Sequence, residues 1–342
     1  MKIFVFGAGA SRGSQGKNFS GLKSPLVDDF FTGTYKAVLD GIDFLPHYRR
    51  EIDGLNEEKK KCNSLEIALT SRWDQITRQP SINHQEAEKS FFGFCVYYIW
   101  SFLKDISNTY SSADNENFYK AFLNKLYAQK EPFGIINFNY DTLLDQAYQE
   151  VFNASLVSIQ KYKDLNFIKP HGSVNWFLNP KGNEYIKFYE SEINTQAPLL
   201  YATSLVFEAR SLEESLIARP DSPDIRSPSF LVGRNFNSQF GIPLILLPLS
   251  SKQYSHIAGF SEGIIDKGRA LLAGAKEIYL IGYKASDDVI HEMLENTPVG
   301  CLLHVINQGS AKEIMDNVLA KHKQLKKGSM CDGGFEDFVS RY

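Results

Sequence analysis

Short apolar runs that end in small or polar residues recur along the chain, and they predict the strands of a sheet. Residues 2–6 form the first run, and residues 134–138 form the second. Further runs lie at residues 156–159, 167–169, 243–247, 277–281 and 302–306, and we expect the last of these to be the final strand. Runs of this length are typical of buried strands.

Between these runs the apolar positions follow helical spacing instead. Residues 65–76, 91–106, 118–127 and 260–275 predict helices, and Ser286 is the expected N-cap of a helix that ends at Glu295. Strands that alternate with helices predict an α/β fold with a Rossmann-like, doubly wound parallel sheet. We expect one domain over residues 1–310 with a mainly helical insertion at about 34–130, and a helical tail over residues 311–342.

Three segments carry turn or loop signals. Residues 176–178 and 185–188 flank Asn, Pro and Gly residues and predict a hairpin. Three prolines in residues 211–234 predict an exposed excursion, and the glycines of residues 12–21 predict a mobile loop.

Composition and charge narrow the classes of protein. With 43% hydrophobic and 23% charged residues in 342, the chain has the composition of a soluble globular protein. A net charge of −3 gives no general attraction to nucleic acid or to an anionic membrane. The four cysteines are scattered, so neither a tetrathiolate zinc site nor a disulfide framework is expected, and the cytoplasm is the natural compartment.

Residues 91–103 are the most apolar stretch of the chain. They are too few to span a membrane. Because the stretch has no polar face, we interpret it as a buried helix or as a contact between copies of the chain, and we expect a homo-oligomer. The apolar run at residues 3–6 is too short for a signal-peptide core.

Two polar features have ordinary explanations. His84 and Glu88 stand four residues apart, but no further ligand accompanies them, so a solvated helix face is expected there and no metal. The lysines of residues 321–327 are typical of a solvated helix end, with an anionic partner as the alternative.

Small or polar residues follow five of the expected strands. In a parallel sheet all of these strand ends lie on one edge, where open α/β sheets bind ligands. Each group alone has a structural explanation, such as a tight turn or a helix cap, but five groups together favour a dinucleotide pocket. The residues are Gly7, Ala8, Gly9, Ala10 and Ser11, then Asn139 and Asp141, then His171, then Gly282, Tyr283 and Asp287, and finally Asn307.

Four of these segments resemble the ordered motifs of sirtuin-like domains. They read Gly-Ala-Gly-Ala-Ser, Phe-Asn-Tyr-Asp-Thr-Leu-Leu-Asp, Pro-His-Gly-Ser and Ile-Gly-Tyr-Lys-Ala-Ser-Asp-Asp. The most similar branch is the bacterial one that consumes NAD⁺ in antiphage defence. The resemblance implies that residues 1–310 are an NAD-binding catalytic domain in which Asn139 and His171 are catalytic. It also implies that residues 7–11 hold the pyrophosphate, whereas Gly282, Tyr283, Asp287 and Asn307 lie towards the adenosine.

The chain departs from the deacylases of that family in two ways. It lacks their four-cysteine zinc module, and Asn137 stands where they usually have Thr. The expected function is therefore NAD⁺ hydrolysis to nicotinamide and ADP-ribose, with NAD⁺ as substrate and without a metal. The alternatives are an NAD-dependent protein deacylase and a non-catalytic module that senses NAD or ADP-ribose.

The residue types suit this chemistry. Nicotinamide leaves as a neutral ring, so the site must orient the ribose and supply a nucleophile. Asn139 can position a water and a ribose hydroxyl, His171 can act as a general base, and Asp141 can hold the nicotinamide carboxamide. A resting cell needs its NAD⁺, so we also expect a regulatory partner protein or a phage-derived trigger.

Overall fold

The computed structural model of the chain describes residues 1–16, 19–33, 35, 45–78, 82–110, 117–178, 216–218, 242–247, 249 and 258–342. They divide into two compact units. The first comprises Met1–Leu26, Asp105–Ser173 and Ser261–Tyr342, and the second comprises Val27–Lys104 and Val174–Phe260.

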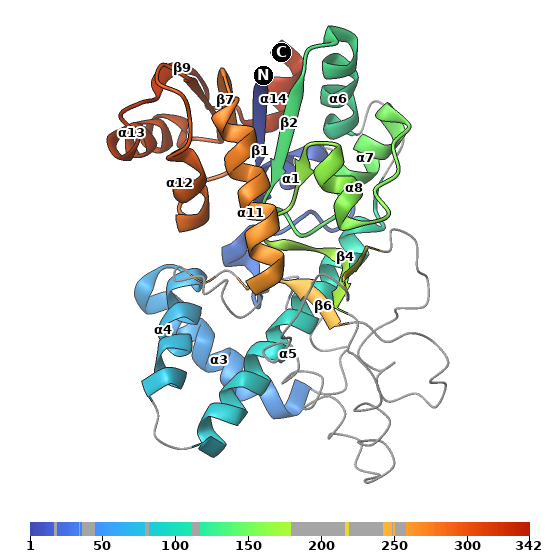
Figure 1. Ribbon diagram of the computed structural model, residues 1–342. Coiled ribbons are helices and arrows are strands. Elements are labelled where there is room, and N and C mark those ends of the chain that lie inside the picture. Colours follow the sequence, from blue (N-terminus) through green and yellow to red (C-terminus); the bar gives the residue numbers. More distant parts are fainter. Residues whose placement is uncertain are drawn as a thin grey trace. The chain divides into compact units, whose positions relative to one another are not determined.

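A parallel sheet of six strands forms the centre of the first unit (Figure 1). Its strand order is β3-β2-β1-β7-β8-β9, and every neighbouring pair is parallel. The strands are β1 (Lys2–Phe6), β2 (Phe133–Asn137), β3 (Phe167–Ile168), β7 (Glu277–Ile281), β8 (Leu302–Ile306) and β9 (Lys326–Cys331).

The chain begins at the middle of this sheet and builds it outwards in both directions. From β1 it adds β2 and β3 on one side, and then returns to add β7, β8 and β9 on the other. This is a Rossmann-like, doubly wound order, so the predicted fold class is confirmed. The order reverses between β1 and β7, and in such sheets that switch point is where ligands bind.

Helices cover both faces of the sheet. On one face the ring of Phe4 lies 5.1 Å from that of Phe122 in α6 (Phe118–Gln129) and 6.3 Å from that of Tyr342, which follows α14 (Gly334–Arg341). On the opposite face, α11 (Ala258–Ala273) places Leu271 against Gly134 of β2. The remaining helices of this unit are α1 (Ala8–Ser14), α7 (Leu143–Phe152), α8 (Ile159–Asp164), α12 (Asp288–Leu294) and α13 (Ala311–Lys321).

The second unit contains the helices of the predicted insertion other than α6, which belongs to the first unit. They are α3 (Leu45–Cys62), α4 (Leu65–Arg78) and α5 (Ile82–Ser107), preceded by the 3₁₀ turn η1 (Val27–Asp29). A small sheet in the order β5-β4-β6 joins them, made of β4 (Gly172–Leu178), β5 (Leu216–Ala218) and β6 (Ile242–Ile245).

The apolar stretch at residues 91–103 lies in α5, and those of its side chains that the structure describes are buried within the chain itself. Tyr98 is fully buried and donates a hydrogen bond of 2.7 Å to the carbonyl of Tyr35, and Trp100 donates one of 2.9 Å to the carbonyl of Val174. This burial removes the reason for expecting a homo-oligomer.

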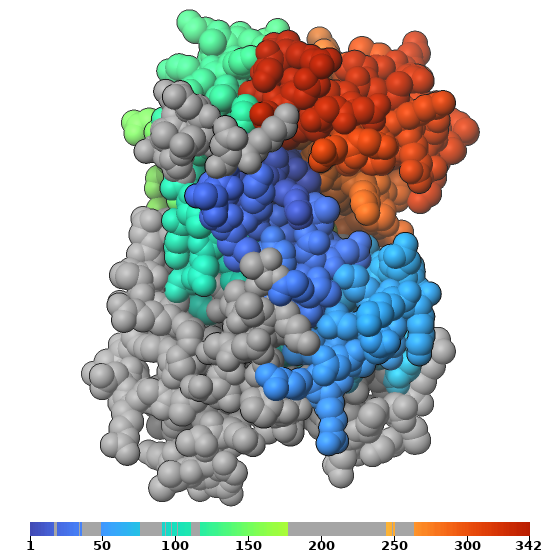
Figure 2. All heavy atoms as spheres, turned by 180° about the vertical axis from the view of Figure 1, so that it is seen from behind, coloured from blue at the N-terminus to red at the C-terminus, as the bar shows by residue number. Residues whose placement is uncertain are grey.

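The prediction of a helical tail over residues 311–342 was wrong in part. These residues also contain a strand of the sheet, β9. β9 pairs with β8, so residues 302–306 are not the final strand. α14 packs beside α6. The ring centroids of Phe335 and Phe122 lie 5.9 Å apart, and Nζ of Lys125 donates to the carbonyl of Val339 at 2.7 Å. Figure 2 shows this C-terminal segment, in red, next to α6, in green.

Three further local predictions were wrong. Residues 156–159 are not a strand, because Ser158 accepts from the amide of Lys161 and starts α8. Asp287, and not Ser286, is the N-cap of α12, which ends at Leu294. Gly13 and Ser14 lie within α1 and not in a loop. The second strand of the predicted hairpin and most of residues 211–234 lie outside the described residues.

Candidate functional site

Glycines let β1 and β7 approach closely at the switch point. The amide of Gly7 donates to the carbonyl of Ile281 at 3.0 Å, and the amide of Gly9 donates to the carbonyl of Gly282 at 2.9 Å. Gly282 has φ +58°, and a Cβ there would collide with the backbone of Ala10. The loop after β7 therefore lies directly on the first turn of α1 and already uses one of its amide donors.

Asn139 lies at the centre of a buried hydrogen-bond cluster beside this turn. Its Nδ2 donates to the carbonyl of Gly7 and to Oγ of Ser11, each at 3.0 Å. The hydroxyl of Tyr119, from α6, lies 3.0 Å from Oγ of Ser11 and 3.4 Å from Nδ2. With both amide protons engaged, the group that Asn139 can offer to a ligand is its carbonyl oxygen, an acceptor.

The carboxylate of Asp141, two residues after Asn139, accepts hydrogen bonds from three donors. Its Oδ1 accepts from Oγ of Ser11 at 3.1 Å and from the amide of Leu143 at 3.2 Å, and its Oδ2 accepts from Oγ of Ser24 at 3.2 Å. The carboxylate is only 2% exposed, and this burial raises its pKa above 3.8, although Lys169 opposes the shift.

A raised pKa makes the contribution of Asp141 to stability depend on pH. The contribution is fully present below pH 3.8 and decreases as the pH rises through the raised value in the folded protein. Asp141→Asn keeps an acceptor for Ser11 and Leu143 and does not titrate. We expect the stability of the wild type relative to Asp141→Asn to fall as the pH rises above 3.8, measured as urea midpoints from pH 4 to pH 8. A difference that grows with pH would contradict the assignment.

His171 and Asp287 form a second polar pair at the same sheet edge. Nε2 of His171 lies 2.5 Å from Oδ2 of Asp287, and both side chains are buried. The rings on either side of Asn139 flank the imidazole, because the centroids of Phe138 and Tyr140 lie 4.8 and 6.0 Å from it. Asn139 and His171 are thus neighbours through the residues that adjoin Asn139 in the chain.

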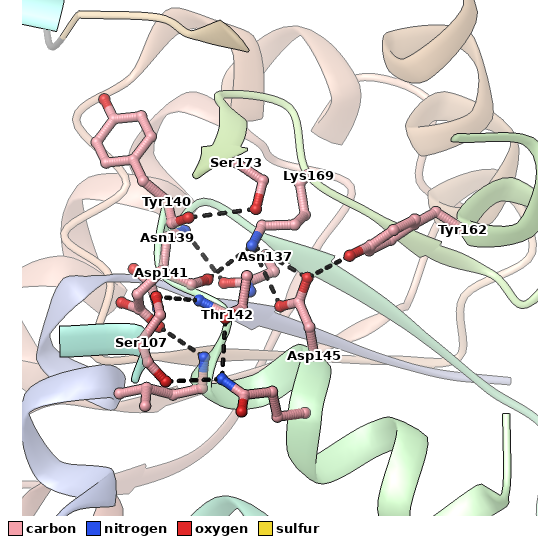
Figure 3. A network of polar contacts seen from close by, with 12 residues as sticks. Ser107, Asn137, Asn139, Tyr140, Asp141, Thr142, Asp145, Tyr162, Lys169 and Ser173 are labelled. Atoms are coloured by element: carbon pink, nitrogen blue, oxygen red, sulfur yellow. Dashed lines mark hydrogen bonds and ion pairs between the residues drawn. The ribbon is translucent and has the colours of Figure 1, made fainter. Parts of the chain in front are cut away.

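A buried ion pair connects the two strand ends that carry Asn139 and His171 (Figure 3). Nζ of Lys169 donates to the backbone carbonyl of Asp141 at 2.7 Å and to both carboxylate oxygens of Asp145 at 3.2 and 3.1 Å. The hydroxyl of Tyr162 donates to Asp145 at 2.6 Å, and Lys169 itself is 0% exposed. The pair fixes the segment after β2 against the end of β3.

The structure brings most of the predicted site residues together, with one exception. Gly7 and Ser11, from the turn at residues 7–11, share one hydrogen-bond cluster with Asn139 and Asp141. Tyr283 stacks on Phe138 with ring centroids 4.5 Å apart. Asn307 stands apart, because its Oδ1 accepts from Oγ of Ser310 at 3.1 Å, in the turn that leads to α13. It shares only the edge of the sheet with the others.

Sequence analysis missed Tyr119, Ser24, Asp145 and Lys169. Asp145 and Lys169 could have been found from the sequence. Asp145 is a charged residue inside an apolar helix pattern, and Lys169 is one at the end of a buried strand, which together imply a buried ion pair. Tyr119 and Ser24 had none, because only the packing of their segments brings them to the cluster.

The described residues lack two kinds of feature. No helix there is long and apolar enough to cross a membrane, and no group of three or more His, Cys, Asp or Glu side chains is arranged to hold a metal ion.

Comparison with known proteins gives only weak likenesses. No protein-family profile and no curated protein matches the chain. One likeness is to a sirtuin structure described as the structural basis of sirtuin substrate affinity. The alignment covers 100% of this chain and 92% of the sirtuin chain, at 12% identity and a TM-score of 0.41. Sir2Tm bound to a propionylated peptide gives 12% identity and 0.37, and Sir2 with a p53 peptide and NAD⁺ gives 11% and 0.36, each aligned over 91% of its own chain and all of this one. At such low scores these likenesses carry no argument about function.

Proposed function

We propose that the chain is an NAD⁺ glycohydrolase, which cleaves NAD⁺ to nicotinamide and ADP-ribose. The observation that carries the proposal is the cluster at the switch point of the sheet. There, a small-residue turn, an asparagine and a histidine–aspartate pair meet at the carboxyl ends of β1, β2, β3 and β7. The motif resemblance to sirtuin-like domains points to the same ligand.

The proposed reaction needs an oriented ribose and a nucleophilic water. Nicotinamide is a neutral leaving group, so no acid is required to expel it. The carbonyl oxygen of Asn139 accepts a hydrogen bond from the water or from a ribose hydroxyl and so fixes its position. His171 takes the proton that the attacking water loses.

The remaining predicted residues serve the same site in this proposal. The first turn of α1, residues 7–11, binds the pyrophosphate in this proposal, through amides other than that of Gly9, which already donates to the carbonyl of Gly282. Gly282 and Tyr283 lie against the same turn. Asp141 is engaged by Ser11, Ser24 and Leu143. Contact with the nicotinamide carboxamide therefore requires Asp141 to exchange one of these donors for the ligand.

The test is an assay of the purified chain with NAD⁺, alone and with an acyl-lysine peptide. Release of nicotinamide and ADP-ribose without peptide is the expected result. Release that requires the peptide would identify a deacylase, and calorimetric binding without turnover would identify a sensing module. Either outcome would overturn the proposal.

We further propose that the activity serves antiphage defence and is controlled by a partner protein or a phage-derived trigger. The motive is chemical, because an uncontrolled hydrolase would drain the NAD⁺ of its own cell. Expression of the chain alone should leave cellular NAD⁺ and growth unchanged, because in this proposal the untriggered chain turns over slowly, fast enough for an assay at high enzyme concentration but too slowly to deplete a cell. Rapid loss of NAD⁺ without infection would contradict the control that we propose.

A further inference from the structure

Asp287 uses both of its carboxylate oxygens in defined contacts. Oδ2 lies 2.5 Å from Nε2 of His171, and Oδ1 accepts the amide of Val289 at 3.0 Å as the N-cap of α12. The side chain is 4% exposed. The contact with His171 and the bond to the amide of Val289 therefore fix the orientation of the Asp287 carboxylate.

The loop that delivers Asp287 turns sharply after β7. Gly282 and Ala285 both have positive φ, at +58° and +52°. A residue other than glycine in this conformation is held by its surroundings at a cost in energy. Ala285 is 5% exposed, which shows that the loop is packed in this shape.

The contact fixes which nitrogen of His171 carries the proton. An ionised carboxylate only accepts hydrogen bonds, so Nε2 must be the donor. In the neutral imidazole, Nδ1 is then the acceptor. A base that takes a proton on Nδ1 becomes a cation whose charge lies next to Asp287.

We propose that Asp287 is the positioning residue of the catalytic base, which holds His171 in the Nε2–H tautomer and stabilises its protonated form. The proposal rests on the proposed function. In it, water gives one proton to Nδ1 as its oxygen bonds to the ribose carbon that nicotinamide leaves. Nε2 keeps its proton throughout, and Asp287 stays ionised. This role differs from the cofactor contact that the motif resemblance implies for Asp287.

Asp287→Asn separates this role from the cap of the helix. Asparagine caps a helix as well as aspartate does. The cap also sets the direction of the new amide, because its oxygen must accept from Val289 and its Nδ2 must then face His171. Since Nδ2 only donates, Nε2 has to become the acceptor, and the proton moves to Nδ1. The variant therefore keeps the fold and inverts the tautomer.

The first measurement is steady-state hydrolysis of NAD⁺. In a serine protease triad the same change lowers kcat by about 10⁴-fold, because the imidazole takes the wrong tautomer. For Asp287→Asn we expect kcat to fall on the order of 10²- to 10⁴-fold, with KM for NAD⁺ nearly unchanged. The acidic limb of the kcat profile should also move to lower pH, because the charge that favours the protonated ring is lost.

Asp288→Asn is the matched control. It removes the same charge from the next residue, which is exposed in the first turn of α12. It should leave kcat unchanged. Equal kcat in the Asp287→Asn and wild-type proteins, or a rise in KM alone, would overturn the proposal, and the second outcome would favour a cofactor contact.

A second measurement does not depend on activity. Nitrogen-15 NMR of histidine-labelled protein, with His171 assigned from His171→Gln, reports the tautomer directly. We expect Nε2–H in the wild type and Nδ1–H in Asp287→Asn. An Nδ1–H tautomer in the wild type would overturn the proposal. If the wild type does not cleave NAD⁺, the proposed function fails, and the NMR result still decides whether Asp287 sets the tautomer.

Discussion

His171→Gln should lower the rate of NAD⁺ cleavage on the order of 10²- to 10⁴-fold, the usual loss when a general base is removed. Glutamine is close to histidine in size and remains polar, but it cannot take up a proton near neutral pH. The packing of Phe138 and Tyr140 around the side chain should survive, so the thermal midpoint should change little. Turnover is measured as nicotinamide released per unit time.

His304→Gln is the matched control for this variant. His304 lies in β8, where it stacks on Tyr279 and bonds to Ser329 at 2.7 Å, and we place it outside the site. It should keep its activity. Wild-type turnover in a folded His171→Gln protein would show that His171 is not the general base, and it would contradict the proposed mechanism.

Asn139→Ala should cause a loss of the same order, for a different reason. It deletes the acceptor that orients the ligand and removes two buried hydrogen bonds, to the carbonyl of Gly7 and to the hydroxyl of Ser11. Each of these groups keeps one partner, the amide of Ala10 and the hydroxyl of Tyr119 respectively. Part of the effect will therefore appear as lower stability, about 0.5–1.5 kcal/mol for each hydrogen bond that is lost. Asn296→Ala, an exposed asparagine, serves as control. Full activity in Asn139→Ala would contradict the proposed mechanism.

Lys169→Met should lower the free energy of unfolding by about 3–5 kcal/mol, because it leaves the buried charge of Asp145 without its partner. Nζ is the only part of Lys169 that carries charge, so methionine keeps most of the packing. The measurement is urea unfolding followed by circular dichroism.

The double variant Lys169→Met/Asp145→Leu tests the cause of that loss. Replacing a buried ion pair by apolar side chains is often neutral, so most of the stability should return. A deficit should remain, because the carbonyl of Asp141 loses a donor and the hydroxyl of Tyr162 loses an acceptor. Lys60→Met breaks an exposed pair with Glu57 and should not move the urea midpoint. If the double variant is no more stable than Lys169→Met, charge burial is not the cause.

The central strands could be predicted from the sequence because they are buried on both faces. β1, β2, β7 and β8 each form a nearly continuous apolar run that ends in small or polar residues. β9 could not be predicted this way. It reads Lys-Lys-Gly-Ser-Met-Cys, and most of its residues are exposed, because it is the edge strand and only its pairing with β8 makes it a strand.

Candidate site residues were predictable only where topology places them. Residues 7–11, Asn139, His171 and Asp287 all follow strands, and parallel pairing brings strand ends together. The contact between His171 and Asp287 is not visible in the sequence, because 116 positions separate them. Tyr119 reaches Ser11 from a helix, and its place depends on how α6 packs against Phe4 and Phe6.

The central position of β1 has a consequence for synthesis of the chain. Lys2 of β1 pairs with Glu277 of β7, so β1 leaves the ribosome long before one of its two neighbours and has to wait for it. At ordinary translation rates the wait is roughly 15–55 seconds. During this time β1 has an open apolar edge and depends on chaperones or on β2 for cover. A nascent chain that ends before β7 also lacks Gly282 and Asp287, so the cluster around Asn139 and His171 is complete only after Asp287 has been made. If the chain hydrolyses NAD⁺ as we propose, the order in which the strands are made keeps a chain that still lacks β7 from doing so.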